Sequence, residues 1–155
     1  MVQVDIYGTF DTPNSECKEC KRSSTTKWSV QEGGNAITAF TVWIRELAKK
    51  KTIKFGKDFL SFLKQLEDGP DGWYIDDPEQ CLDIVTEMKD ALPELGKHFN
   101  VDMKEFSSRV KMGTSWRNSD PDSLPEEKQW ILYYLILMNI LEHVGKYKGE
   151  FKQSF

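Results

Sequence analysis

The chain contains few of the residues that usually build metal and redox sites, with three cysteines and two histidines among its 155 residues. An odd number of cysteines argues against a disulfide framework and favours a reducing compartment. The longest apolar run, 130–138, is about half of the ~20 residues that a membrane span requires. The first residues show no basic segment followed by an apolar core, so we expect no signal peptide. Together these absences predict a cytoplasmic protein without a membrane span.

The N-terminal part of the chain has the pattern of strands. Apolar and polar residues alternate over 2–10 and again around 26–30, and the polar stretch 11–24 between them is typical of a long hairpin loop. From residue 35 onward the period becomes helical. The sequence therefore predicts one α+β, mostly α, domain over 1–155. Residues 1–34 should form a two-stranded β-hairpin packed on about five helices within 35–155, because a lone hairpin is only marginally stable.

The expected helices begin at recognisable caps. Asn35 should cap the first, which runs to about 51, and the second covers about 56–67. Asp77 followed by proline opens the third, which Pro93 should end or kink. A fourth begins at Asp102 and is closed by Gly113; the fifth begins at the Ser123 cap and continues through 128–144.

The fifth helix is the predicted centre of the core. From Trp130 to Leu141 eleven of twelve residues are apolar, so nearly every side of this helix should be covered. The exception is Asn139, which must find a hydrogen-bond partner or cost about 1–3 kcal/mol. On the third helix, the buried stripe should consist of Cys81, Val85, Met88 and Leu92.

Local motifs for chemistry are weak. The segment 68–79 has the length of an EF-hand calcium loop, but Pro70 and Gly72 replace two side-chain ligands and Trp73 stands where glycine is needed. Cys17 and Cys20 supply half of a zinc site and are only weak metal candidates, since structural zinc needs four ligands. No nucleophile elbow, phosphate loop or dinucleotide fingerprint is present in the sequence. We predict no catalytic residues and no cofactor.

Charge is distributed very unevenly along the chain. Residues 67–94 contain ten acids and a single base, Lys89, whereas the whole chain carries a net charge of only −4. Like charges at helical spacing repel one another by a few tenths of a kcal/mol per pair. An acidic surface that also presents aromatic rings suits a basic protein partner and repels nucleic acid. The predicted partner-binding residues are Asp68, Asp71, Trp73, Tyr74, Asp76, Asp77, Glu79, Asp83 and Glu87.

Three classes of function follow. The favoured hypothesis is a small cytoplasmic inhibitor, of the immunity-protein, antitoxin or anti-defence type, that neutralises a basic protein such as a nuclease toxin by direct binding. The first alternative is a small enzyme whose site joins the 68–79 carboxylates with the 113–120 loop, with His98 or Arg117 contributing. The second is a nucleic-acid-associated adaptor that uses the lysine-rich segments 49–54 and 146–152. The sequence makes no prediction of the oligomeric state.

Overall fold

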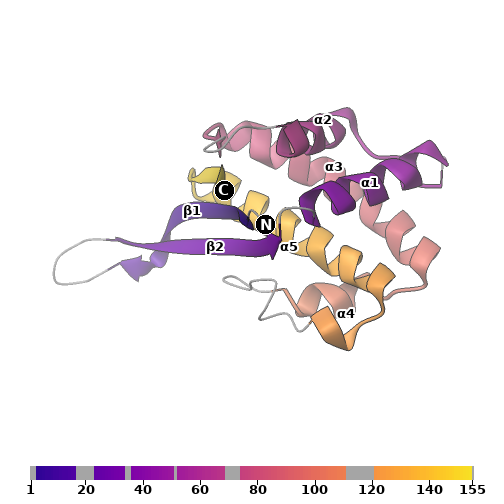
Figure 1. The fold of residues 1–155 in the computed structure, drawn as a ribbon. Helices are drawn as coiled ribbons and strands as arrows, with labels where there is room; N and C mark the ends of the chain where they lie inside the picture. The colour runs from indigo at the N-terminus through magenta and orange to yellow at the C-terminus, as the bar shows by residue number, and fades with distance from the viewer. Residues whose placement is uncertain are drawn as a thin grey trace.

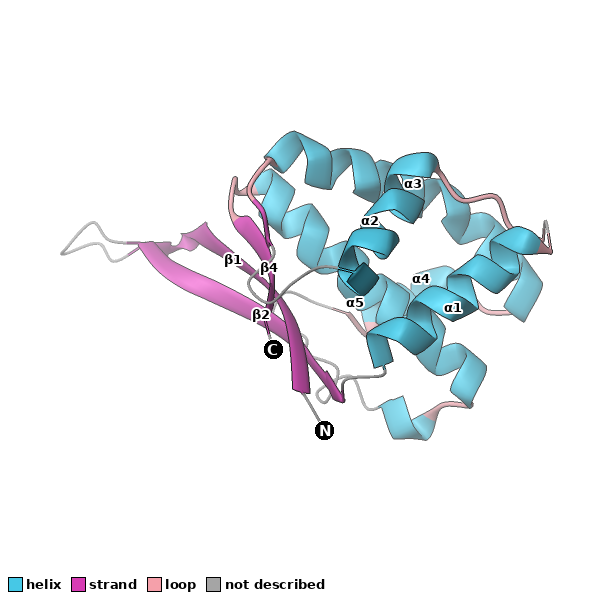
Figure 2. Ribbon diagram, turned by 45° about the horizontal axis from the view of Figure 1, so that its top comes forward, coloured by secondary structure: helices cyan, strands magenta, loops and turns pink. Residues whose placement is uncertain are grey.

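The computed structural model describes residues 3–16, 23–33, 36–50, 52–68, 74–110 and 121–154. A β-sheet lies on one side of the molecule and the helices lie on the other (Figures 1 and 2). Along the chain the elements are β1 (Gln3–Glu16), β2 (Ser23–Gly33), α1 (Ala36–Lys49), α2 (Lys57–Asp68), β3 (Tyr74–Ile75), α3 (Pro78–Phe99), α4 (Met103–Ser108), η2 (Pro121–Ser123), α5 (Glu126–Lys146) and β4 (Glu150–Ser154).

The sheet has four strands in the order β2-β1-β4-β3. β1 pairs antiparallel with β2, and Gly8 lies opposite Trp28 in this register. On its other edge β1 pairs with β4 over Asp5–Thr9. The two-residue strand β3 adds to the far side of β4. Beyond the reach of β4, β1 and β2 project away from the helices (Figure 1).

The predicted fold class is therefore wrong in its sheet. A two-stranded hairpin confined to residues 1–34 was expected, but the sheet is completed by strands from 74–75 and 150–154. Residues 11–16 and 23–24, expected as loop, belong to β1 and β2. The physical reason is that strand pairing is long-range: β4 is specified by the edge of β1 that it satisfies, not by a pattern within its own five residues.

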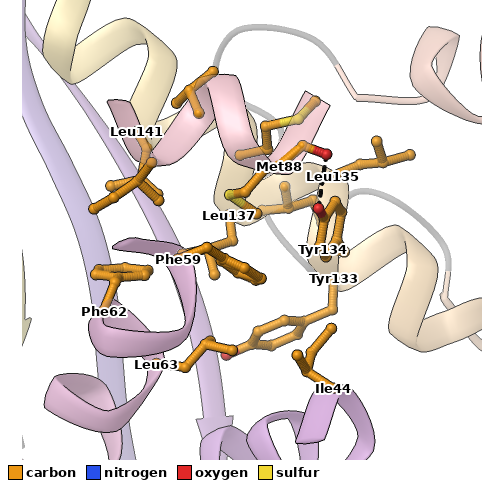
Figure 3. Packing of buried hydrophobic residues seen from close by; sticks show 14 of the residues in the cluster. Ile44, Phe59, Phe62, Leu63, Met88, Tyr133, Tyr134, Leu135, Leu137 and Leu141 are labelled. Carbon is orange, nitrogen blue, oxygen red and sulfur yellow. Dashed lines mark hydrogen bonds between the residues drawn. The ribbon is translucent and has the colours of Figure 1, made fainter. Parts of the chain in front are cut away.

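The core forms around α5, as predicted. All residues from Ile131 to Leu137 are at most 2% exposed, and α1, α2 and α3 supply the side chains that cover them. Figure 3 shows Tyr134 pointing toward α3, where its hydroxyl donates a 2.8 Å hydrogen bond to the Met88 carbonyl. The Asn139 amide has the partner that its position requires, since Nδ2 donates to the Val110 carbonyl at 3.4 Å.

Three predicted helix ends differ from the structure. α3 continues through Pro93 to Phe99, where Asn100 closes it in the left-handed conformation. The cost of a proline inside a helix, about 3 kcal/mol, is offset because the chain beyond it still buries Leu95 completely. Ser123 lies in the short η2 turn, so Pro125 occupies the N-cap position of α5 without a side-chain cap. α4 ends at Ser108, before the Gly113 end that was expected.

Among the described residues, no helix is both long and apolar enough to span a membrane. This agrees with the short apolar run seen in the sequence.

Candidate functional site

Several acidic residues of the segment 67–94 lie at the surface where α2 and α3 are in contact. Asp58, Ser61 and Gln65 lie three and four residues apart on α2, so they follow one face of that helix. Residues from the first turns of α3 lie across from them, and Glu87 of α3 contacts the first turn of α2. The two helices therefore run alongside each other with polar faces turned to a shared groove.

This groove has a volume of about 370 Å³. Such a volume lies within the roughly 300–1,000 Å³ of ordinary binding sites. Phe62 and Ile84, each about 1% exposed, contribute its apolar base. We refer to it as the α2–α3 groove. Its lining residues are Asp58, Ser61, Phe62, Gln65, Asp77, Glu79, Gln80, Asp83 and Ile84.

The α2–α3 groove carries four carboxylates and no lysine, arginine or histidine in its lining. Within the described parts of the chain, Asp58, Glu79 and Asp83 form no ion pair. Lys89, the single base of the acidic segment, is turned to α5 instead, where its Nζ lies 2.8 Å from Oε1 of Glu142. The negative charge of the groove is thus left without a counter-charge from the described residues, which favours an incoming cation.

Two of the predicted contact residues have structural roles. The Asp77 carboxylate caps α3, accepting hydrogen bonds from the backbone N–H groups of Glu79 at 3.0 Å and Gln80 at 3.4 Å. The Glu87 carboxylate caps α2 from the neighbouring helix, accepting from the N–H groups of Asp58 at 3.1 Å and Phe59 at 3.0 Å. Glu87 consequently has a structural role in the fold, whereas the sequence analysis had predicted it to bind a partner.

The remaining predicted contact residues are dispersed. Asp68 is the exposed last residue of α2, and Asp76 is exposed just before α3. The backbone of Tyr74 pairs with Lys152 in the sheet. Asp71 and Trp73 lie outside the described residues, as do the zinc candidates Cys17 and Cys20. Of the predicted set, the structure brings Asp77, Glu79 and Asp83 together in the α2–α3 groove.

The α2 side of the groove was missed by the sequence reading. Asp58, Ser61 and Gln65 have the spacing of a polar helix face, which is visible in the sequence. That spacing is typical of any solvated helix, so it gives no sign that α3 lies beside it. Only the tertiary contact turns the two separate polar faces into one groove.

Two observations concern metal ligands and titratable groups in the described residues. No group of three or more His, Cys, Asp or Glu side chains there has the arrangement of a metal site. Burial raises the pKa of the Cys81 thiol to about 12, with a further contribution from the Asp77 charge, so this thiol stays protonated at neutral pH. The 113–120 loop of the enzyme hypothesis, including Arg117, lies outside the described residues.

His98, the other candidate of the enzyme hypothesis, lies far from the α2–α3 groove. It stands near the end of α3, whereas Glu79 stands in the first turn. With a rise of about 1.5 Å per residue, these positions are roughly 28 Å apart along the helix. The structure therefore does not bring this histidine to the groove carboxylates.

Comparison of the chain with protein-family models, curated proteins and solved structures found no match.

Proposed function

We propose that this protein is a small cytoplasmic inhibitor that binds a basic protein partner through the α2–α3 groove. The observation that carries the proposal is the set of four carboxylates around a groove of about 370 Å³ whose lining has no basic residue. A basic toxin or effector, such as a nuclease, fits this surface by charge. A nuclease binds phosphate through lysine and arginine side chains, so an acidic groove competes for the same groups.

The shape of the groove suits this role better than a flat acidic helix face would. Its carboxylates stand on two helices and surround a partly apolar base, so a basic side chain can be bound on two sides. Ser61, Gln65 and Gln80 add neutral hydrogen-bonding groups to the same walls. The acidic field speeds encounter with a basic partner, and these polar walls lengthen the lifetime of the complex.

The experiment uses two isosteric triple variants that remove the same charge. The groove variant is Asp58→Asn, Glu79→Gln and Asp83→Asn, which leaves the Asp77 cap in place. The control variant is Asp90→Asn, Glu94→Gln and Glu126→Gln, at positions outside the groove lining. Each tagged protein is used to capture partners from the source lysate at low and at moderate salt, followed by quantitative mass spectrometry.

We expect a basic protein that the wild type and the control variant retain and the groove variant loses. Its purified form should bind the groove variant at least about tenfold more weakly, since a charge-assisted hydrogen bond contributes about 1.5–3 kcal/mol. The wild type should also inhibit the activity of that protein in proportion to binding. Equal loss of the partner in both variants would show that binding depends on net charge and not on the groove. Capture that is identical for all three proteins would exclude the groove as the binding site.

A further inference from the structure

A second hollow lies at the opposite end of α3 from the α2–α3 groove. It has a volume of about 210 Å³ and is bordered by α1, the end of α3 and the start of α5. We call it the aromatic cleft. The residues that matter for its chemistry are Trp43, Glu46, Lys50, His98, Phe99 and Glu127.

Aromatic rings from two helices form one side of the aromatic cleft. Trp43 of α1 and Phe99 of α3 have ring centroids 5.6 Å apart and planes inclined by 28°. The His98 ring stands at 89° to that of Phe99, with centroids 4.6 Å apart. Trp43 and Phe99 are only partly buried although they pack against the core. Ring faces carry a negative quadrupole, which attracts a cation placed within about 6 Å of the centroid.

Carboxylates on two different helices add to this negative potential. Glu46 comes from α1 and Glu127 from the first turn of α5, and both are exposed. Lys50 lies one helical turn after Glu46, yet among the described residues it forms no ion pair with either acid. With two carboxylates and one ammonium group, the border of the cleft is negative on balance, so it favours a cationic occupant.

The size of the cleft decides the kind of occupant. At about 210 Å³ it is smaller than the roughly 300–1,000 Å³ of sites that enclose a whole small molecule. It is therefore suited to a single side chain projecting from a partner. Guanidinium groups stack on aromatic faces and pair with carboxylates through a planar fork, and they are less strongly hydrated than ammonium groups.

We propose that the aromatic cleft binds one arginine side chain of a protein partner. The guanidinium plane stacks on the Trp43–Phe99 surface while its N–H groups donate to Glu46 and Glu127. Arginine is enriched among the residues that dominate binding energy at interfaces. This site does not depend on the α2–α3 groove, from which it is separated by most of the length of α3.

The test is an NMR titration of the full chain with N-acetyl-arginine-N-methylamide as the probe. We expect saturable shifts of the Trp43 indole N–H and of the amides of His98 and Phe99. The lysine and norleucine analogues of the probe should bind at least about fivefold more weakly, because neither offers a planar cation. The double variant Glu46→Gln, Glu127→Gln should weaken binding of the arginine probe about tenfold or more.

The matched control is Glu126→Gln, which removes one charge from the same turn of α5 without touching the lining of the cleft. It should leave the affinity unchanged, as should the groove variant. The proposal is overturned if the arginine and norleucine probes shift the same amides equally. It is also overturned if adenosine monophosphate binds the cleft and the arginine probe does not, because that result indicates stacking of a nucleobase.

Discussion

Cys81 and Tyr134 are two weak acids enclosed by the core. Both side chains are fully buried, one on α3 and the other on α5. Burial raises the pKa of Cys81 to about 12 and raises that of Tyr134 above its ordinary value. Each is therefore protonated in the folded protein under conditions where the unfolded chain begins to ionise. The protein should accordingly lose stability at alkaline pH.

The first prediction concerns the contribution of Cys81 to this loss. The ordinary pKa of a cysteine thiol is 9.0, and burial raises the pKa of Cys81 to about 12 in the folded protein. Above pH 9 the unfolded chain releases a proton that the folded protein keeps, so the free energy of unfolding falls as the pH rises toward 12. The Cys81→Ala variant should show a shallower fall than the wild type in urea denaturation measured at several pH values between 8 and 11. Parallel curves would mean that the thiol ionises equally well in the folded state.

α2 depends on another helix for its N-terminal cap. The Glu87 carboxylate accepts hydrogen bonds from two of the first backbone N–H groups of α2. Such groups lack partners within their own helix. Gly56, just before α2, has no side chain where a Cβ would overlap the Glu87 carboxylate. The cap in its observed geometry thus involves both a glycine and an acid, which stand 31 positions apart in the chain.

The second prediction tests this cap. The Glu87→Ala variant should lower the free energy of unfolding by about 0.5–2 kcal/mol, the usual cost of a lost N-cap. Glu94→Ala is the control, because Glu94 is an exposed glutamate on the same helix and makes no such contact. Both are compared by urea denaturation at neutral pH. If the two variants are equally stable, the Glu87 contact does not contribute to holding α2 in place.

β4 connects the sheet to the helical part of the molecule. It lies between β1 and β3 in the sheet. Its Phe151 is fully buried, with its ring centroid 5.4 Å from that of Phe62 on α2. Gly8 of β1 provides a second connection, since a Cβ there would come within 2.6 Å of Val144 on α5. These close contacts contribute to fixing the position of the sheet on the helices.

The third prediction concerns the whole fold. Phe151→Ala should lower the free energy of unfolding by about 3–5 kcal/mol, because it removes a large buried ring and leaves a cavity. The control is Glu150→Ala on the same strand, whose ion pair with Lys152 is partly exposed and should contribute no more than about 1 kcal/mol. Thermal unfolding followed by circular dichroism compares the two. A small effect of Phe151→Ala would show that the buried ring contributes little to holding β4 on the helices.

At the scale of the whole molecule, the uneven distribution of charge sets the two proposed binding sites apart from ordinary solvated surface. The negative charge of residues 67–94 is not neutralised by Lys89, the only base among them, because Lys89 pairs with Glu142 of α5. Salt should weaken binding at the α2–α3 groove, since exposed charges are screened beyond about 8–10 Å. Binding at the aromatic cleft should respond less, because part of its attraction comes from the rings. The two sites can thus be separated by ionic strength as well as by their variants.

The positions of the helices and the apolar character of α5 were predictable because helix formation is largely local. The stripe of Cys81, Val85 and Met88 depends on residues three and four positions apart, and the caps at Asp77 and Asp102 depend on their own first turns. Pro93 does not end α3, because packing beyond it outweighs its local cost.

The sheet and the candidate site followed from contacts between distant parts of the chain. β4 has no partner within its own segment, and it becomes a strand by pairing with residues more than 140 positions earlier. The α2–α3 groove likewise exists only because α3 packs beside α2, where Glu87 accepts a hydrogen bond from the first turn of α2. Local periodicity records which face of a helix avoids the core. Local periodicity does not record which other helix lies beside that face, because the packing of the complete chain determines which helices are neighbours.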